Sequence, residues 1–374
     1  MKKYLSLTLA ITMSLVLFTG CIGTTVVIGE CNHTDIGVTT PAEPSTPSTP
    51  NTPTNPPVST TPESPSGSTK TGLSVSTTVS DSTPAADGQE GCIKYDITLA
   101  AVTVDDAGMI QSCVIDSIPA SVSFDAAGNI VSDVTAAVPT KNEMGADYGM
   151  VAWGGAKAEW NEQVAALASY AIGKTVDELK NGAIDESGKA PEGSDLASSA
   201  SIYLGGYVSA IEAAVSNAQH LGAQSGDTLA LVTMNELKSS TSAAADQDGN
   251  SQLDASIAVV THRDGVITSC YLDAVQAKIA FNASGEITSD LTAAISTKNE
   301  MGADYGMVAW GGAKAEWNEQ AAAFAEYVTG KTADEVAGIA ITETTKPADG
   351  SDLASSVTIS VGGFQSLIAK ALTE

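Results

Sequence analysis

The sequence predicts an α+β protein built from two tandem copies of one unit, each a small antiparallel sheet packed against helices. Residues 140–163 recur without a change as residues 297–320, here called the identical block, at an offset of 157 residues (297 − 140). In each copy, alternating apolar residues precede apolar residues at helical spacing. We therefore expect four segments: a lipoprotein signal peptide (1–20), a lipidated N-terminus with a disordered Pro/Thr/Ser linker (21–69), a first copy (70–221) and a second copy (226–374).

The first 20 residues have the pattern of a bacterial secretory signal. Lys2 and Lys3 precede an apolar run over residues 5–18, which is short for a membrane span. The segment ends before Cys21 and resembles a lipobox, although Phe18 stands where that motif most often has leucine. Lipidation of Cys21 would anchor the chain to the outer face of the cell membrane, at about 0.8 kcal/mol per buried CH₂. The alternative is an ordinary signal peptide with a chance cysteine.

The linker contains nine of the fourteen prolines, all within residues 41–65. Such a segment cannot bury a core and is extended, at about 3 Å per residue. It is typical of a stalk that lifts the two copies off the membrane. A stalk on a lipoprotein indicates a Gram-positive-type envelope.

Composition limits the classes of partner. The formal net charge is −27, and it becomes −29 once a leader containing Lys2 and Lys3 is removed. This charge repels nucleic acid and anionic membrane surfaces, so neither is an expected partner. A phosphate-bearing ligand would need local donors or a covalent tether. Apolar residues make up 43% of the chain, which is enough to bury a core in each copy.

The cysteines and histidines do not form a metal or haem motif. Cys113 and Cys270 occupy equivalent strand positions, so we expect both to be small buried hydrophobes. Cys31 and Cys92 have no counterparts and could form a disulfide outside the cell. The sequence has no CxxC pair, and its three histidines are scattered: His33, His220 and His262.

Each copy opens with a loosely patterned stretch, over 73–79 and 229–234, and a hairpin pattern follows after a polar loop. In the first copy, apolar residues alternate over 97–104 and 109–115, on both sides of an Asp/Gly turn at 105–108. The second copy repeats the pattern around a turn at 263–265. A third short strand is predicted to contain 122–124, to turn at 127–128 and to resume at Ile130.

The identical block divides into a loop and a helix. Residues 141–155 are rich in glycine and lack periodicity, so we predict a loop, long enough to indicate function or a packed excursion. Helical spacing begins at 156 and continues to 171. Thr175 is a good N-cap for a following short helix, and the last helix is predicted over 204–215, mirrored by 361–372.

Four motifs occur in a characteristic order: a hairpin xAxVTVDxxGxI, a helix with WxxQ, a GKTxDEV turn and an Asp-rich loop before the final helix. This order resembles the FMN-binding domain family of bacterial surface and respiratory proteins, over roughly residues 90–220 and 250–374. In that family a motif like D-x-x-S-G-A-T enters the last helix. Its Thr can carry FMN through a phosphoester bond made by a separate flavin transferase.

The resemblance implies specific site residues. The matching segments read Asp352-Leu-Ala-Ser-Ser-Val-Thr358 and Asp195-Leu-Ala-Ser-Ser-Ala-Ser201, so Thr358 is the acceptor candidate and Ser201 a poorer one. The glycine of the motif is replaced by serine in both copies, so covalent attachment at Thr358, noncovalent FMN and no FMN at all stay open as alternatives. The FMN phosphate would meet hydroxyls and free helix-start N–H groups, and apolar side chains of the identical block would flank its ring. These candidates are Ser198, Ser199 and Ser201 with Tyr148, Met150 and Trp153, and Ser355, Ser356 and Thr358 with Tyr305, Met307 and Trp310.

Each candidate also has a structural interpretation. The Ser-Ser pairs would serve equally as helix caps. Trp160 and Trp317 are expected in the core. The identity of the block has its own alternatives, because a recent duplication, a shared packing role or a shared ligand would each preserve it.

The first functional hypothesis is an extracytoplasmic flavin-based electron carrier, anchored by lipid and served by a flavin transferase and a redox partner. The alternative is a cofactor-free surface binding or adhesion module that uses the repeated aromatic loop. A hydrolase is a distant third, because the sequence has no Ser-His-Asp arrangement and no paired carboxylates at recognisable spacing. Substrate turnover is therefore less expected than electron transfer or binding.

Overall fold

A computed structural model describes residues 67–373 of the chain except residue 87. The expected leader, the proline-rich linker, Cys21 and Cys31 lie outside the described residues. Cys92 is disulfide-bonded. The described chain is α+β with two three-stranded antiparallel sheets, which confirms the prediction of an α+β fold with antiparallel sheets.

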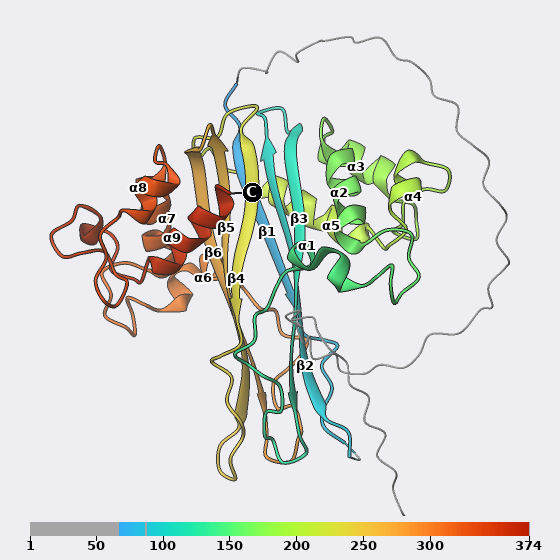
Figure 1. Ribbon diagram of the computed structural model, residues 1–374, viewed down its shortest axis with the longest axis vertical. Helices are drawn as coiled ribbons and strands as arrows, with labels where there is room; N and C mark the ends of the chain where they lie inside the picture. Colours follow the sequence, from blue (N-terminus) through green and yellow to red (C-terminus); the bar gives the residue numbers. More distant parts are fainter. Residues whose placement is uncertain (1–66, 87, 374) are drawn as a thin grey trace, which may run out of the picture.

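Each sheet is formed by consecutive strands that pair in chain order (Figure 1). The first sheet comprises β1 (Lys70–Thr78), β2 (Gly91–Val104) and β3 (Ile110–Phe124). The second comprises β4 (Thr228–Glu236), β5 (Gly249–Arg263) and β6 (Val266–Phe281). The two hairpins predicted from alternation are therefore present, as β2–β3 and β5–β6, and both are longer than predicted.

The two hairpin turns use different chemistry. Between β2 and β3, the Asp105 carboxylate accepts hydrogen bonds from the amides of Ala107 and Met109, at 3.0 and 2.9 Å. The β5–β6 connection is shorter, and both Asp264 and Gly265 have positive φ angles, of 52° and 76°. Two successive positive φ angles suit the right-handed twist of a two-residue hairpin.

The predicted third strand was placed wrongly. Residues 122–124 are the end of β3, and Ile130 makes only an isolated bridge back to Phe124. The actual third strand is β1, in which Leu73 and Val75 alternate with Ser74 and Ser76. Leu73 and Ser74 are both buried, and a Cβ at Gly72 would lie 2.0 Å from the carbonyl oxygen of Ala214.

The helical segments follow each sheet in the same order. In the first half they are α1 (Lys141–Met144), η1 (Gly145–Tyr148), α2 (Trp160–Ala171), α3 (Val176–Ala183), α4 (Asp195–Ser199) and α5 (Gly205–Ser216). In the second half they are α6 (Lys298–Met301), η2 (Gly302–Tyr305), α7 (Trp317–Val328), α8 (Ala333–Ala337), η3 (Leu353–Ser355) and α9 (Gly362–Ala371). Thr175 caps α3 as predicted, by accepting a hydrogen bond from the amide of Glu178. The prediction of a continuous loop over 141–155 was wrong, because α1 and η1 occupy its first half.

The elements form four layers, with the two sheets inside and the helices on the two outer faces (Figure 1). Alternate residues of β2 divide between the cores: Leu99 packs between the sheets, whereas Ala100 and Val102 pack against the helices of the first half. At the centre of the inner core the rings of Phe124 and Phe281 stack with centroids 4.3 Å apart. No helix within the described residues is long and apolar enough to cross a bilayer.

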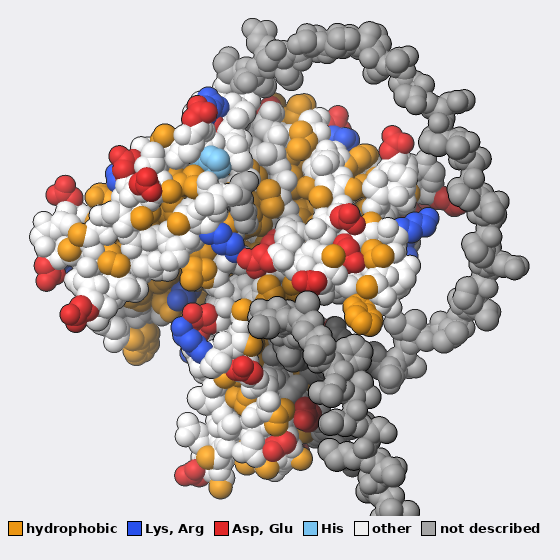
Figure 2. Space-filling view, viewed as in Figure 1, with side chains coloured by type: hydrophobic (Ala, Val, Ile, Leu, Met, Phe, Trp, Pro, Cys, Tyr) orange, Lys and Arg blue, Asp and Glu red, His pale blue; other side chains and the backbone are white. Residues whose placement is uncertain are grey.

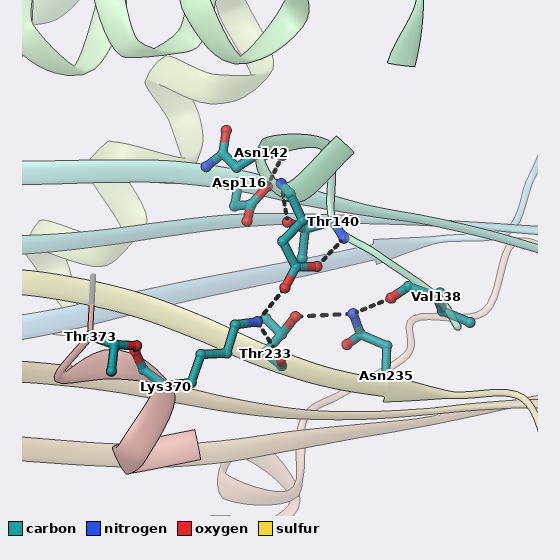
Figure 3. Close-up of polar contacts among 9 residues, drawn as sticks. Asp116, Val138, Thr140, Asn142, Thr233, Asn235, Lys370 and Thr373 are labelled. Atoms are coloured by element: carbon teal, nitrogen blue, oxygen red, sulfur yellow. Dashed lines mark hydrogen bonds and ion pairs between the residues drawn. The ribbon is translucent and has the colours of Figure 1, made fainter. Parts of the chain in front are cut away.

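The halves are joined by matched and by unmatched contacts. The amide of Ala85 donates to the carbonyl of Gly285, and the amide of Ala243 donates to that of Gly128, both at 2.8 Å. One unmatched contact is made by Lys370 of α9, which pairs with Glu143 and donates to the carbonyl of Thr233 at 3.0 Å. Figure 3 shows Lys370 reaching Thr233 while Asn235 donates to the carbonyl of Val138 nearby. The position equivalent to Lys370 is Ala213, so the first half cannot reciprocate.

Candidate functional site

The identical block is fixed to its sheet at its first turn. Thr140 caps α1 by accepting from the amide of Glu143, and the Glu143 carboxylate accepts from the amide of Thr140 at 2.7 Å. Asp116 of β3 accepts from the amide of Asn142 at 3.1 Å, and Asn142 donates to the carbonyl of Ile115. Burial raises the pKa of Asp116 to about 6. The block therefore starts from a rigid, partly desolvated anchor.

The second half repeats this anchor. Asp273 accepts from the amide of Asn299 at 3.1 Å, and Asn299 donates to the carbonyl of Leu272 at 2.8 Å. Burial raises the pKa of Asp273, too, to about 6.

A buried glutamate holds the glycine-rich loop. Glu159 is 8% exposed, and its carboxylate accepts from the amides of Met150 and Val151 at 2.8 and 3.0 Å. The same side chain caps α2, and its own amide donates to Glu162. Glu316 makes the equivalent contacts to Met307 and Val308. Sequence reasoning missed this role, although the glutamate stands directly before the first helical tryptophan in both copies.

Tyr148 and Met150 contribute to a pocket of about 410 Å³ on the first half. The pocket lies where the identical block meets β2 and the start of α5. Its lining residues are Thr98, Lys141, Tyr148, Met150, Trp160, Ile202, Tyr203, Gly206 and Tyr207. Two of the three predicted ring partners are thus placed beside the segment that follows Ser201.

The walls of this pocket are aromatic. Trp160 is 3% exposed, which confirms its expected place in the core, and its indole N–H donates to the Tyr207 hydroxyl at 2.9 Å. The two rings meet edge to face, with centroids 5.8 Å apart. Burial raises the pKa of Tyr207, so its hydroxyl stays protonated at neutral pH.

A lysine supplies the positive charge in the pocket. The ammonium of Lys141 lies 5.2 Å from the ring centroids of both Tyr148 and Trp160, in cation–π range. The side chain is 9% exposed, and its ion-pair partner, Asp96, is 4.0 Å away. Lys141 therefore offers an unusual local cation on a strongly acidic protein. It belongs to the identical block, but the prediction of a loop there left it without a role.

The predicted acceptor segment is fixed by a buried glutamine. The side-chain oxygen of Gln163 accepts from the amides of Ser201 and Ile202, at 2.8 and 3.2 Å, and from the Ser201 hydroxyl at 3.2 Å. In the second half, Gln320 accepts from the Thr358 amide and hydroxyl, at 2.7 and 3.1 Å. The helical spacing of Trp160 and Gln163 was visible in the sequence, but only the fold places the glutamine beside residue 201.

The Ser-Ser pairs do not begin the final helix. Ser198 and Ser199 end α4, and α5 begins at Gly205. The Ser198 hydroxyl donates to the carbonyl of Asp195 at 2.6 Å, and Ser355 donates to Asp352 at 2.7 Å. Ser356 donates to the carbonyl of Leu353 at 3.4 Å. The helix start that meets the pocket is that of α5, through Gly206 and Tyr207.

Other predicted residues lie away from the pocket. Trp153 and Trp310 are 88% and 89% exposed, and neither Trp153 nor Asp195 lines the pocket. In the second half, Tyr305 and Met307 pack against the core that contains Trp317. Lys298 lies 4.8 Å from the Tyr305 ring and 5.2 Å from the Trp317 ring, as Lys141 does in the first half.

Within residues 67–373 apart from residue 87, no three Cys, His, Asp or Glu side chains are grouped as a metal site. Burial raises the pKa of Cys113 and of Cys270 to about 12, so neither thiol is a thiolate at neutral pH. Comparison with protein-family models, curated proteins and solved structures finds no match to this chain.

Proposed function

We propose that the chain is an extracytoplasmic binding protein whose first-half pocket takes a flat aromatic ligand with an anionic group, FMN being the leading candidate. The observation that carries the proposal is the pocket itself, where Tyr148 and Met150 meet Trp160, Tyr207 and the Lys141 ammonium. A pocket of about 410 Å³ lies within the range of small-molecule sites. With bound flavin, the protein would act as an electron carrier rather than as a substrate-converting enzyme.

The ring of the ligand would pack between aromatic side chains. Flat apolar groups gain from offset or edge-to-face contact with aromatic rings. Tyr148 and Tyr203 belong to different elements that border the same pocket, and Met150 adds a polarisable thioether. The ring of the ligand can therefore be bound by uncharged side chains alone.

The anionic group would meet Lys141 and the first turn of α5. The amides of the first turn of an α-helix have no partner within the helix, and Gly206 and Tyr207 of that turn line the pocket. Negative charge is stabilised at a helix N-terminus. Attachment at Ser201 is part of the same proposal, with the contact from Gln163 positioning the hydroxyl. Attachment at Thr358, beside Gln320, would instead be a separate site of the second half.

The remaining parts of the proposal concern the whole chain. Two tandem copies of one unit would be held on a stalk, with Cys21 carrying the lipid. A flavin transferase and a redox partner would be the expected partners. The agreement in element order between the two halves supports the duplication, and the lipid anchor rests on the leader sequence.

The test combines colour, mass and affinity. The mature protein from its native host should be yellow, with either an added FMN phosphoester mass after denaturation or release of free FMN. Lys141→Met should weaken FMN binding at least about tenfold, as expected for loss of one charge-assisted contact. Gly206→Leu should do the same by filling the pocket, because a Cβ there meets nothing within 4 Å.

The second half provides matched controls. Lys298→Met and Gly363→Leu change equivalent positions and should leave the first-half site intact, since a Cβ at Gly363 is also unobstructed. A colourless protein of unmodified mass that does not bind added FMN would refute the proposal. Equal losses from first-half and second-half variants would refute the assignment to the first half.

A further inference from the structure

Trp153 and Trp310 are almost fully exposed, at 88% and 89%. They occupy the same position in the two identical blocks. Val151 and Val308 beside them are 44% and 45% exposed, so each loop presents an apolar tip. Exposed tryptophan on a folded loop is typical of a contact surface, because tryptophan is the residue most enriched among binding hot spots.

The loop holds each indole ring in place. The Trp153 amide donates to the carbonyl of Gly149 at 2.9 Å, and the Ala156 amide donates to that of Met150 at 3.0 Å. Gly149 has a φ of 81°, and a Cβ on it would lie 2.1 Å from the Cδ1 atom of Trp153. Only glycine therefore allows the ring to pack its edge on this backbone. At Gly306, the corresponding distance to Trp310 is 2.2 Å.

Charge excludes several partners. The protein carries a formal charge of −27, and Figure 2 shows acidic side chains over both helical layers. Anionic lipid surfaces, nucleic acids and other polyanions are therefore repelled. An uncharged partner avoids this repulsion and can still bind to an indole face.

The two tips are well separated. The loops that follow η1 and η2 lie on opposite flanks of the molecule (Figure 1). A flexible polymer with repeating units can reach two identical sites at once.

We propose that Trp153 and Trp310 are two stacking platforms for an uncharged polysaccharide made of pyranose rings. The C–H face of a pyranose presents partly positive hydrogens, and the face of an indole is partly negative. Two linked contacts on one polymer raise the apparent affinity above that of either alone. This inference does not depend on the proposed pocket ligand.

The experiment measures binding of the full mature chain to soluble hydroxyethyl cellulose and dextran, two uncharged and flexible polymers of pyranose rings. Trp153→Ala and Trp310→Ala should each weaken binding at least about tenfold, and the double variant should abolish it, as expected when bivalent attachment is lost. Val151→Ala with Val308→Ala is the matched control, since it trims the same tips without removing a ring. Far-UV circular dichroism should be unchanged in every variant, because the rings are exposed.

Three outcomes would overturn the proposal. The first is that the wild-type chain binds neither polymer. The second is that the double tryptophan variant binds as well as the wild type. The third is tryptophan-dependent binding to phosphatidylcholine vesicles without binding to the polymers, which would assign the tips to a lipid surface.

Discussion

The pocket of the first half and the equivalent region of the second half share one floor but have different walls. The floor comes from the identical block, in which Lys141 and Lys298 each lie over the same pair of aromatic residues. The wall comes from the last helix, where Tyr207 corresponds to Phe364. Packing is nearly the same, because Trp317 and Phe364 also meet edge to face, at 6.0 Å. The hydrogen bond from Trp160 to Tyr207 has no possible counterpart at a phenylalanine.

The surroundings of the two lysines differ as well. Asp96 is the ion-pair partner of Lys141. The equivalent Asp254 instead accepts hydrogen bonds from Gln252 and Gln276, at 2.8 and 2.9 Å. The identical block therefore gives the two sites the same local structure, whereas the segments that have diverged determine the chemistry of each site. Equivalent mutations should therefore match in stability and differ in binding.

The largest expected effect concerns the core that the two halves share. Phe124 and Phe281 are fully buried and stacked on each other. Phe124→Ala and Phe281→Ala should each lower the free energy of unfolding by about 3–5 kcal/mol, the usual cost of removing a buried phenylalanine. Urea denaturation should show one cooperative transition and nearly equal losses. Two separate transitions would mean that the halves fold independently despite the shared core.

Next in size is a pH dependence common to both halves. Asp116 and Asp273 have folded pKa values of about 6, above the usual value near 3.8, because burial disfavours their charged form. The folded state then binds more protons than the unfolded state between about pH 4 and pH 6. The free energy of unfolding should therefore fall as pH rises through this window, by about 2–3 kcal/mol per carboxyl.

Thermal unfolding between pH 4 and pH 7 measures this dependence, and asparagine variants test its origin. Asp116→Asn with Asp273→Asn keeps the acceptor for the amides of Asn142 and Asn299 but removes the titration. These variants should flatten most of the pH dependence. An unchanged slope would assign the effect to the general charge of the protein instead.

A smaller effect is expected at the contact that Lys370 makes between the halves. Lys370→Met removes the ion pair with Glu143 and the hydrogen bond to Thr233. Because Lys370 is 30% exposed, solvent screens the pair, and we expect a loss of about 0.5–1.5 kcal/mol in chemical denaturation. Lys180→Met, at the exposed pair with Glu212, is the control and should change stability less. A larger loss in the control would show that the inter-half position has no special weight.

The smallest effect should come from exchanging the aromatic residues at the two equivalent positions of the last helix, Tyr207 and Phe364. Tyr207→Phe gives the first half the wall of the second, and leaves the Trp160 N–H without its acceptor. We expect a loss of about 1 kcal/mol. Phe364→Tyr should cost little, because the aromatic packing is the same. Equal effects from the two changes would contradict the claim that the walls differ in chemistry.

Local signals in the sequence predicted much of the secondary structure. Alternation over 97–104 and 109–115 located the first hairpin, and helical spacing located α2, α5, α7 and α9. β1 was left unassigned, although Leu73 and Val75 alternate with Ser74 and Ser76 as expected for a strand. The helical start of the block escaped because α1 has only four residues and is held by capping, which produces no periodicity.

In the candidate site, too, residues with a local sequence signal were predicted and residues without one were not. Tyr148 and Met150 were chosen as flat or apolar residues in a repeated loop, and both line the pocket. Lys141, Gln163 and Glu159 were not chosen. Their roles depend on contacts with residues that lie 7 (148 − 141) to 45 (141 − 96) positions away along the chain.

By itself, the sequence determined the repeat, the fold class, the hairpins, the helix caps and the acidic surface, because these follow from periodicity, short-range capping and composition. The tertiary structure was needed to show that the two sheets pack face to face, that Phe124 meets Phe281, and that the ammonium of Lys141 lies 5.2 Å from the centroids of two aromatic rings. Contacts of this kind depend on register and layer packing between distant segments. A local pattern carries no record of which distant residue will lie on the other side of a core.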